Sequence, residues 1–395
     1  MQNWLRRPIG APLRQAYGLS KGMPLGLVPK ADGLRSHERS VTVAMTDYQE
    51  GEMSSVQQAS SSRPATIHSF VWMRAFGAVA IVILHAFITV QKASDPASIT
   101  FLRDTAEAWV SIVLTRWAVP AFFMMSGALM LDPARDVSWN KIGRHVWRLV
   151  FVLLTIGFAF CIVEEALEVG SLGPAVVLEA FLNLLRGKSW DHLWFVYRLI
   201  GFYLITPVIR PYVAQASRRE LLAVVAGMFL LMQGVNTLGT LVGVLLWSPL
   251  DLAADLAWYV AGYAVHRYVR LNRQVALAGA GSLLLMLILR VVYHDSWMSL
   301  PEHAVVVPYA IAVFAAFEHY CEKPVRDGGA VKLLADYSFG IYLLHPAAQH
   351  ALVRVIDMGR LPVVAADLVA IVVPLVASVA MVWALRLLPP FRDKL

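Results

Sequence analysis

The sequence predicts an all-α membrane protein, a bundle of about ten transmembrane helices with both termini in the cytoplasm. Of its 395 residues, 58% are hydrophobic and only 15% are charged, and the mean hydropathy is +0.59. Apolar stretches long enough to cross a bilayer, which takes about 20 residues at about 1.5 Å each, recur from Phe70 onward. Lys and Arg gather in alternate loops, as is typical of the cytoplasmic loops of membrane proteins.

The residues before the first apolar span predict a polar tail. Residues 1–66 are rich in Ser, Gly, Gln and Arg, which favours a disordered or loosely ordered cytoplasmic segment. No apolar core of signal-peptide type precedes Phe70. The stretch that begins at Met53 would also suit a translation start, so the sequence leaves open whether residues 1–52 belong to the working protein. A membrane domain over residues 67–390 and a short cytoplasmic tail over 391–395 are expected to follow.

Ten apolar spans make up the predicted membrane domain. They lie near residues 70–90, 109–131, 146–167, 192–212, 221–246, 252–268, 275–293, 304–320, 333–353 and 363–388. Basic loops follow every second span, and most of the opposite loops carry acids, among them Glu164, Glu165 and Glu168. The loop with Arg354 and Arg360 fits this alternation least well. The fifth and seventh spans are almost featureless, which is typical of lipid-facing or packing helices.

Charge and cysteine content exclude other classes. The formal net charge of +7 and the pI near 9.4 would suit a nucleic-acid-binding protein. The basic residues form short clusters between apolar spans, however, so we interpret them as topology signals and expect no nucleic-acid partner. Cys161 and Cys321 match no ligand spacing, so neither a disulfide framework nor a metal site is predicted.

The first span carries two costly polar residues, Arg74 and His85. Inside a membrane such side chains face protein or water and are functional candidates. Eleven steps of about 100° return to within about 20° of the start, so both lie on one helix face about 16 Å apart. Loop charges place Arg74 nearer the cytoplasm. His85 can serve as a general base or form an acyl intermediate, whereas Arg74 stays protonated and suits a phosphate, a carbonyl or a partner carboxylate.

A basic face marks the start of the third span. Lys141, Arg144 and Arg148 are spaced three and four apart, so one helix face presents three cations at the cytoplasmic mouth. The fork of donors on an arginine matches phosphate, as in a coenzyme A thioester. Retention of basic loops in the cytoplasm, or contact with anionic lipid, explains the same cluster equally well.

Further candidates lie on the second, fourth and ninth spans. In the second span, Pro120, Ser126 and Gly127 suit a kinked packing helix as well as a site, and Arg116 either lies at the depth of His85 or extends to the outer surface. In the fourth, His192, Trp194 and Tyr197 also fit an interfacial aromatic belt, and deeper Arg198 and Tyr203 need partners. In the ninth, Ser338, Tyr342 and His345 share one face, where a buried histidine more often bonds a neighbouring helix than catalyses.

Five of these motifs, in this order, resemble the acyltransferase 3 family of integral membrane O-acyltransferases over about residues 67–390. They are Arg74 with His85, the FFxxSG motif (Phe122, Phe123, Ser126, Gly127), the basic cluster Lys141, Arg144 and Arg148, the HLWF segment with Tyr203 and Pro207, and SFGIYLLHP from Ser338 to Pro346. The branch that O-acetylates enterobacterial common antigen looks most similar. Val71 and Ala75 stand where the family often has Asp and Gly, which leaves the carboxylate partner of Arg74 open.

The resemblance implies a multi-pass enzyme of the bacterial inner membrane. Its donor would be acetyl-coenzyme A, or less favoured succinyl-coenzyme A, used as a substrate with no permanently bound cofactor. Its acceptor would be a surface or polyprenyl-linked glycan, with membrane lipids around it, His85 as catalytic base and Arg74 as the donor-positioning residue. A transporter or flippase for a lipid-linked sugar is the alternative, although repeat symmetry, which transport predicts, is not evident.

Overall fold

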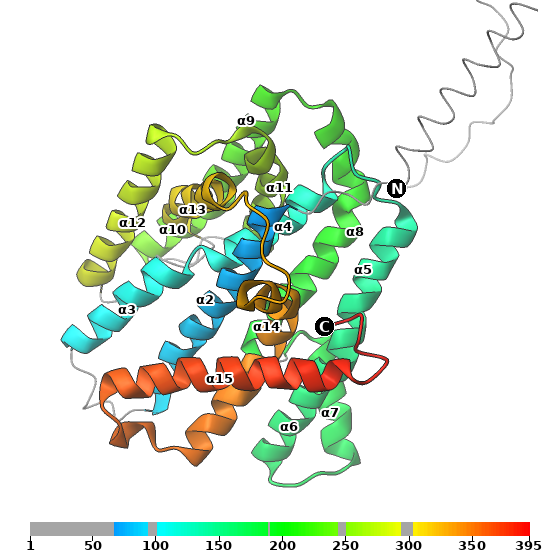
Figure 1. Cartoon of the computed structure of the whole chain (residues 1–395), viewed down its shortest axis with the longest axis vertical. Helices are drawn as coiled ribbons and strands as arrows, with labels where there is room; N and C mark the ends of the chain where they lie inside the picture. Colours follow the sequence, from blue (N-terminus) through cyan, green and yellow to red (C-terminus); the bar gives the residue numbers. More distant parts are fainter. Residues whose placement is uncertain (1–66, 94–100, 189, 244–249, 294–302) are drawn as a thin grey trace, which may run out of the picture. The chain divides into compact units, whose positions relative to one another are not determined.

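The computed structural model describes residues 67–93, 101–188, 190–243, 250–293 and 303–395. These residues form helices joined by turns, and no strand occurs among them, which confirms the all-α class (Figure 1). The polar tail predicted over residues 1–66 lies outside the described residues.

Each of the ten expected spans is helical over most of its described residues. The α-helices are α2 (His68–Ala93), α3 (Phe101–Thr115), α4 (Ala118–Met130), α5 (Trp139–Val152), α6 (Phe158–Val169), α7 (Pro174–Leu185), α8 (Trp194–Gln215), α9 (Arg218–Met228), α10 (Gly234–Val242), α11 (Leu250–Tyr268), α12 (Arg273–Tyr293), α13 (Val307–Tyr320), α14 (Ala330–Val355) and α15 (Val363–Arg386). One of them, α7, was not expected. Its twelve residues start at Pro174, a favoured first position, but are too few to signal a span.

Three predicted spans are built from two helices each. The second is α3 followed by α4, with a turn at Arg116 and Trp117. The third joins α5 to α6 through a π-helical turn, Leu153–Gly157, and the fifth joins α9 to α10 through another, Phe229–Gln233. Such turns insert an extra residue into a helix, so they re-aim every side chain that follows.

Six helical segments among the described residues are long and apolar enough to cross a membrane by length and composition, so this is a multi-pass membrane protein. They are His68–Lys92, Arg103–Met130, Trp139–Val169, Arg218–Gly239, Arg273–Val292 and Val363–Arg386. The helices α8, α11, α13 and α14 fall outside this group. The count of ten spans and the cytoplasmic placement of both termini stay predictions.

The core of the bundle lies around α2. This helix packs most extensively against α14 and also contacts α15, α4, α3 and α13 (Figure 1). Met73, Ala78 and Val82 are fully buried, and the Gln349 Nε2 of α14 donates to the carbonyl oxygen of Val82 at 3.1 Å. By contrast, only 22% of the apolar stretch in the fifth and seventh spans is buried, against 56% in α2. Of the two alternatives expected for those spans, lipid-facing or packing helices, this low burial favours the lipid-facing one.

Two glycines bring α4 and α11 into close contact. A Cβ atom at Gly127 would meet the backbone carbonyl of Tyr259, and a Cβ atom at Gly262 would meet the backbone carbonyl of Met124. Each helix therefore supplies the small residue that the other needs, the usual route to close packing of membrane helices. The hydroxyls of Thr206 on α8 and Tyr259 on α11, 2.7 Å apart, tie α8 to the same crossing.

Candidate active site

Arg74 of α2 meets charged residues from three other helices. Asp336 of α14 is the carboxylate that interacts electrostatically with it. Arg148 of α5 interacts with both Arg74 and Arg386 of α15. The Arg74 side chain stays exposed although its helix is central. We call Arg74, Arg148 and Arg386 the arginine cluster.

Aromatic rings of α14 hold two members of the arginine cluster in place. The Arg148 guanidinium lies 5.1 Å from the centre of the Phe339 ring, and that of Arg386 lies 4.8 Å from the centre of Tyr337. Arg148 Nε also donates to the carbonyl oxygen of Lys394 at 2.7 Å. Cation–π contacts orient a guanidinium without neutralising it, so the cluster keeps the positive charge that a phosphate group requires.

The three cations of the predicted basic face on α5 have two sets of neighbours. Arg148 belongs to the arginine cluster. Lys141, Arg144 and Arg148 also interact electrostatically with His145 on the same helix. The His145 ring lies 5.7 Å from that of Tyr203 on α8. Arg144 is exposed and is free to contact a soluble ligand or lipid headgroups.

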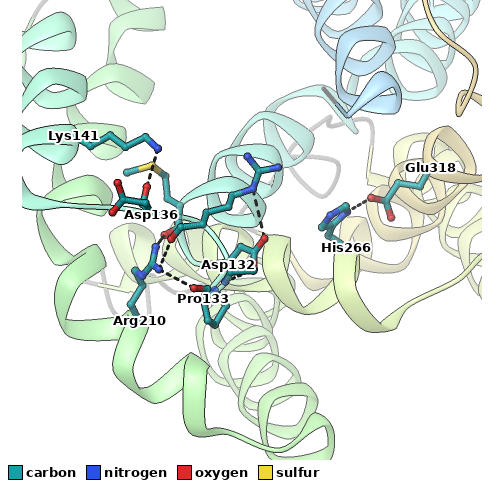
Figure 2. Close-up of polar contacts among 10 residues, drawn as sticks. Asp132, Pro133, Asp136, Lys141, Arg210, His266 and Glu318 are labelled. Atoms are coloured by element: carbon teal, nitrogen blue, oxygen red, sulfur yellow. Dashed lines mark hydrogen bonds and ion pairs between the residues drawn. The ribbon is translucent and has the colours of Figure 1, made fainter. Parts of the chain in front are cut away.

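The loop before α5 is held by hydrogen bonds that place this face (Figure 2). Arg210 of α8 donates to the carbonyl oxygens of Met130 and Arg135, at 3.2 and 2.7 Å, at the C-terminal end of α4. Lys141 Nζ donates to the carbonyl oxygen of Asp136 at 2.7 Å. A cation at a helix C-terminus satisfies otherwise unpaired carbonyls. Lys141 therefore uses one of its hydrogen-bond donors to hold the loop.

A second cluster is formed by three histidines from three elements. His85 lies on α2, His345 on α14, and His192 in the 3-10 turn Asp191–Leu193. The ring centres of His85 and His345 are 4.9 Å apart, and those of His192 and His345 are 5.7 Å apart, both with edges toward faces. We call these residues the histidine cluster. In the described part of the chain, no group of three His, Cys, Asp or Glu has a metal-binding arrangement.

Backbone carbonyls fix the protonated nitrogen of each ring. A carbonyl oxygen only accepts, so the Nδ1–H groups of His85 and His345 donate to Ile81 and Ile341, both at 3.0 Å, and Nε2–H of His192 donates to Leu343 at 3.2 Å. In neutral His85 the lone pair therefore lies on Nε2. That is the state in which an imidazole acts as a base.

The two other polar residues predicted on α14 support the backbone. The Tyr342 hydroxyl donates to the carbonyl oxygen of His192 and so anchors the turn that carries this histidine. The Ser338 hydroxyl donates to Ala335 of its own helix at 2.8 Å. Both are buried on the same face as His345, as the spacing predicted.

An aromatic layer from α4 and α8 borders the histidine cluster. Phe123 packs against Trp194, Phe195 and Phe202, and the Phe122 ring lies 6.3 Å from Phe195. Phe195 in turn contacts Tyr342, with ring centres 5.5 Å apart. Below this layer, Ser126 hydrogen-bonds to the Tyr203 side chain.

Two further polar residues were predicted from the sequence, Arg198 and Arg116. Arg198 of α8 has found a carboxylate, because its NH1 lies 2.7 Å from Asp255 Oδ2 on α11. Arg116 is half-buried in the turn between α3 and α4, and its role in the site stays a prediction.

Three residues of the site were not singled out from the sequence: Asp336, His145 and Arg386. His192 was indicated as the start of the HLWF segment and as part of an interfacial aromatic group, but not as a neighbour of His345. A signal existed for Asp336, since an acid two residues before Ser338 at the start of a polar span face needs a cation. His145 likewise falls between two of the predicted basic residues, on the same helix face.

The fold and the two clusters define a multi-pass membrane protein whose central helix carries a cationic site and a histidine site about 16 Å apart. Comparison with protein families identifies the class of chemistry. The family model described as "Acyltransferase domain" matches residues 67–386. The chain therefore belongs to the acyltransferase 3 family and is a membrane acyltransferase. Comparisons with curated proteins and with solved structures gave no match, so the similarity to the common-antigen branch stays a prediction.

Proposed function

We propose that the protein transfers an acyl group, acetyl in preference to succinyl, from coenzyme A to a hydroxyl of a bacterial surface glycan or its polyprenyl-linked precursor, in the inner membrane. The observation that carries this proposal is the pairing of the two clusters on α2. Phosphates of the donor suit the arginine cluster, and the acyl thioester on its long arm suits the histidine cluster. Both the family and the electrostatics favour acyl transfer over transport.

The reaction follows from the state of His85. Its Nε2 accepts the proton of the acceptor hydroxyl while the hydroxyl oxygen attacks the thioester carbonyl. The new carbon–oxygen bond forms, the carbon–sulfur bond breaks, and the proton leaves with the coenzyme A sulfur as a thiol. The Nδ1–H bond to Ile81 stabilises the protonated ring between these steps.

Arg74 and Arg148 bind the donor in this scheme. Each offers a planar set of donors that matches phosphate oxygens. Asp336 attracts Arg74 and so offsets part of the repulsion within the arginine cluster. Asp336 would then be the carboxylate for Arg74 that the sequence left open at Val71, where the family often has an acid.

The direct test is expression of the full chain in a bacterial strain without O-acetylated surface glycan, followed by mass spectrometry of that glycan. The proposal expects a mass increase of one acetyl group, and release of coenzyme A when purified protein receives acetyl-coenzyme A and the isolated glycan. A succinyl increment would correct the acyl group. Release of coenzyme A without any acylated glycan would contradict the proposal.

A further inference from the structure

A cavity of about 490 Å³ opens between α6, α7 and the turn before α8. Glu164, Glu165 and Glu168 line it from α6, and Asn183 lines it from α7. Trp190 and Trp194 line it on the third side. None of these residues belongs to the arginine cluster or the histidine cluster.

We propose that this cavity binds the saccharide of the acyl acceptor, through a portion of the glycan that carries no acidic group. The inference rests on the proposed acyl transfer and adds the place and charge class of the acceptor.

Its position in the bundle suits an acceptor that arrives from the side opposite the donor. The span Trp139–Val169 carries Arg148 near one end and the three glutamates near the other. Glu165 lies seventeen positions after Arg148, or about 26 Å along a helix. The donor site and the cavity thus lie toward opposite ends of one membrane-crossing segment.

A chain of ring contacts connects the cavity to the histidine cluster. Trp190 stacks on Phe160 of α6, with ring centres 4.3 Å apart and planes 6° from parallel. The Trp190 ring also lies 6.3 Å from that of His192, which contacts His345 and through it His85. Three successive ring contacts therefore lead from the wall of the cavity to the proposed base, so a sugar held in the cavity would leave a neighbouring residue of the same glycan to reach His85.

The lining has the chemistry of a sugar site. Carboxylates accept hydrogen bonds from hydroxyl groups, and an amide both donates and accepts. Asn183 Nδ2 donates to Glu165 Oε1 at 2.6 Å, which orients both groups and leaves lone pairs of the carboxylate for a ligand. Flat indole rings give apolar faces for the carbon–hydrogen side of a sugar ring.

The charge of the lining selects among saccharides. The lining residues include three glutamates and one cation, Lys188, so their summed charge is negative. The cavity therefore attracts hydroxyl-bearing or amine-bearing groups and repels carboxylates and phosphates. This is the reverse of the arginine cluster, which suits the anionic donor.

The test compares variants of the full chain in the glycan acylation assay. The double variant Glu165→Gln with Glu168→Gln keeps the shape of the cavity and removes two charges, and Trp190→Phe keeps a ring. We expect each to lower the acylated fraction of the host's surface glycan at least tenfold, while binding of labelled acetyl-coenzyme A to the purified protein stays within twofold of wild type. Glu179→Gln is the matched control, because Glu179 lies on α7 outside the cavity and pairs with exposed Arg186 at 2.7 Å.

The outcomes separate the two proposals. Wild-type acylation by all cavity variants would overturn the acceptor site and leave acyl transfer standing. Loss of acetyl-coenzyme A binding together with acylation would also overturn the acceptor site, since the cavity would then serve the donor or the fold. If wild-type protein neither binds acetyl-coenzyme A nor marks the glycan, the proposed function itself fails.

The preference of the cavity for neutral or cationic saccharides over anionic ones is tested by a separate binding measurement. Tryptophan fluorescence of the purified protein is titrated with diacetylchitobiose, chitobiose and digalacturonate, which are neutral, cationic and anionic disaccharides. We expect at least one of the first two to bind at least tenfold more tightly than digalacturonate, and Trp190→Phe to reduce the response. Equal or tighter binding of digalacturonate, or no response to any of the three, would overturn the proposed charge class.

Discussion

Arg74 owes its suitability for an anion to its neighbours. Arg148 and Arg386 add positive charge at the same place, and Asp336 offsets part of it. Asp336 is itself shared, because Lys332 Nζ lies 2.5 Å from its Oδ2. The site as a whole therefore stays cationic, and a phosphate bound as proposed would relieve the repulsion among the arginines.

Loss of either Arg74 or Arg148 should weaken binding of the donor. For Arg74→Ala and for Arg148→Ala we expect the KM for acetyl-coenzyme A to rise about 10- to 100-fold, since a charged hydrogen bond contributes about 1.5–3 kcal/mol. Arg148→Lys should recover part of the loss, because an ammonium keeps the charge but not the fork of donors. Initial rates at varied acetyl-coenzyme A measure the effect. The exposed Arg219 supplies the control variant Arg219→Ala, and an unchanged KM in both site variants would remove these arginines from the donor site.

For single residues, the sequence predicted the polar side chains that are costly to place in a membrane helix better than it predicted the residues that contact them. Arg74 and His85 were found from their cost in a membrane helix, and their common face followed from helix geometry alone. Asp336 lies 262 positions after Arg74, and no local rule brings those two residues together. The histidine cluster was missed for the same reason, because three separate elements supply it.

Among the helices, the crossing of α4 and α11 determines how the aromatic layer is held. The FFxxSG motif presents Phe122 and Phe123 toward α8, and its glycine lets α11 approach from another side. The motif thus combines two packing requirements within six residues.

Adding one methyl group at this crossing should destabilise the fold. In Gly127→Ala the new Cβ meets a backbone carbonyl that no side-chain rotation can move, so a cost of at least about 1–3 kcal/mol is expected. Thermal unfolding in detergent should show a Tm lower by several degrees. Gly281→Ala on α12 is the control, since a Cβ there has open space. Equal Tm values for the two variants would contradict the close crossing.

Most of the helices were predictable, whereas α7 and the two π-helical interruptions were not. Long apolar runs predicted all ten segments, because hydrophobic length is a direct consequence of burial in lipid. The break at Arg116 and Trp117 lies one turn before Pro120, which has no N–H to donate to the carbonyl oxygen of Arg116, as expected of the kink predicted for this span. The π-helical turns at Leu153–Gly157 and Phe229–Gln233 have no comparable compositional signal. Such interruptions depend on packing against neighbouring helices.

Across the whole molecule, the proposed donor site and the proposed acceptor site lie toward opposite ends of the bundle. α2 and the span Trp139–Val169 both carry arginine toward one end and rings that meet the histidine cluster farther along. The acyl group would then cross most of the membrane on the donor's own arm, without transport of coenzyme A.

Topology follows from the same arrangement and is testable by cysteine labelling. A cysteine replacing Ser171, in the loop between α6 and α7, should react with a membrane-impermeant maleimide on intact spheroplasts, whereas one replacing exposed Arg219 should react only after lysis. The background variant Cys321→Ser removes the less buried native thiol. Labelling of both positions from the same side would overturn the opposed arrangement and the cytoplasmic placement of the basic loops.

The role of His85 is the central claim, and acyl transfer by a His85→Ala variant tests it most directly. The variant is compared with wild type and with His319→Ala, which changes an exposed histidine away from the clusters, by the initial rate of labelled acetyl transfer to isolated surface glycan. The account predicts that His85→Ala lowers the rate about 10²- to 10⁴-fold, the usual contribution of a general base, while acetyl-coenzyme A binding and Tm match the wild type. A correctly folded His85→Ala protein that transfers acetyl groups at a rate close to wild type would contradict it.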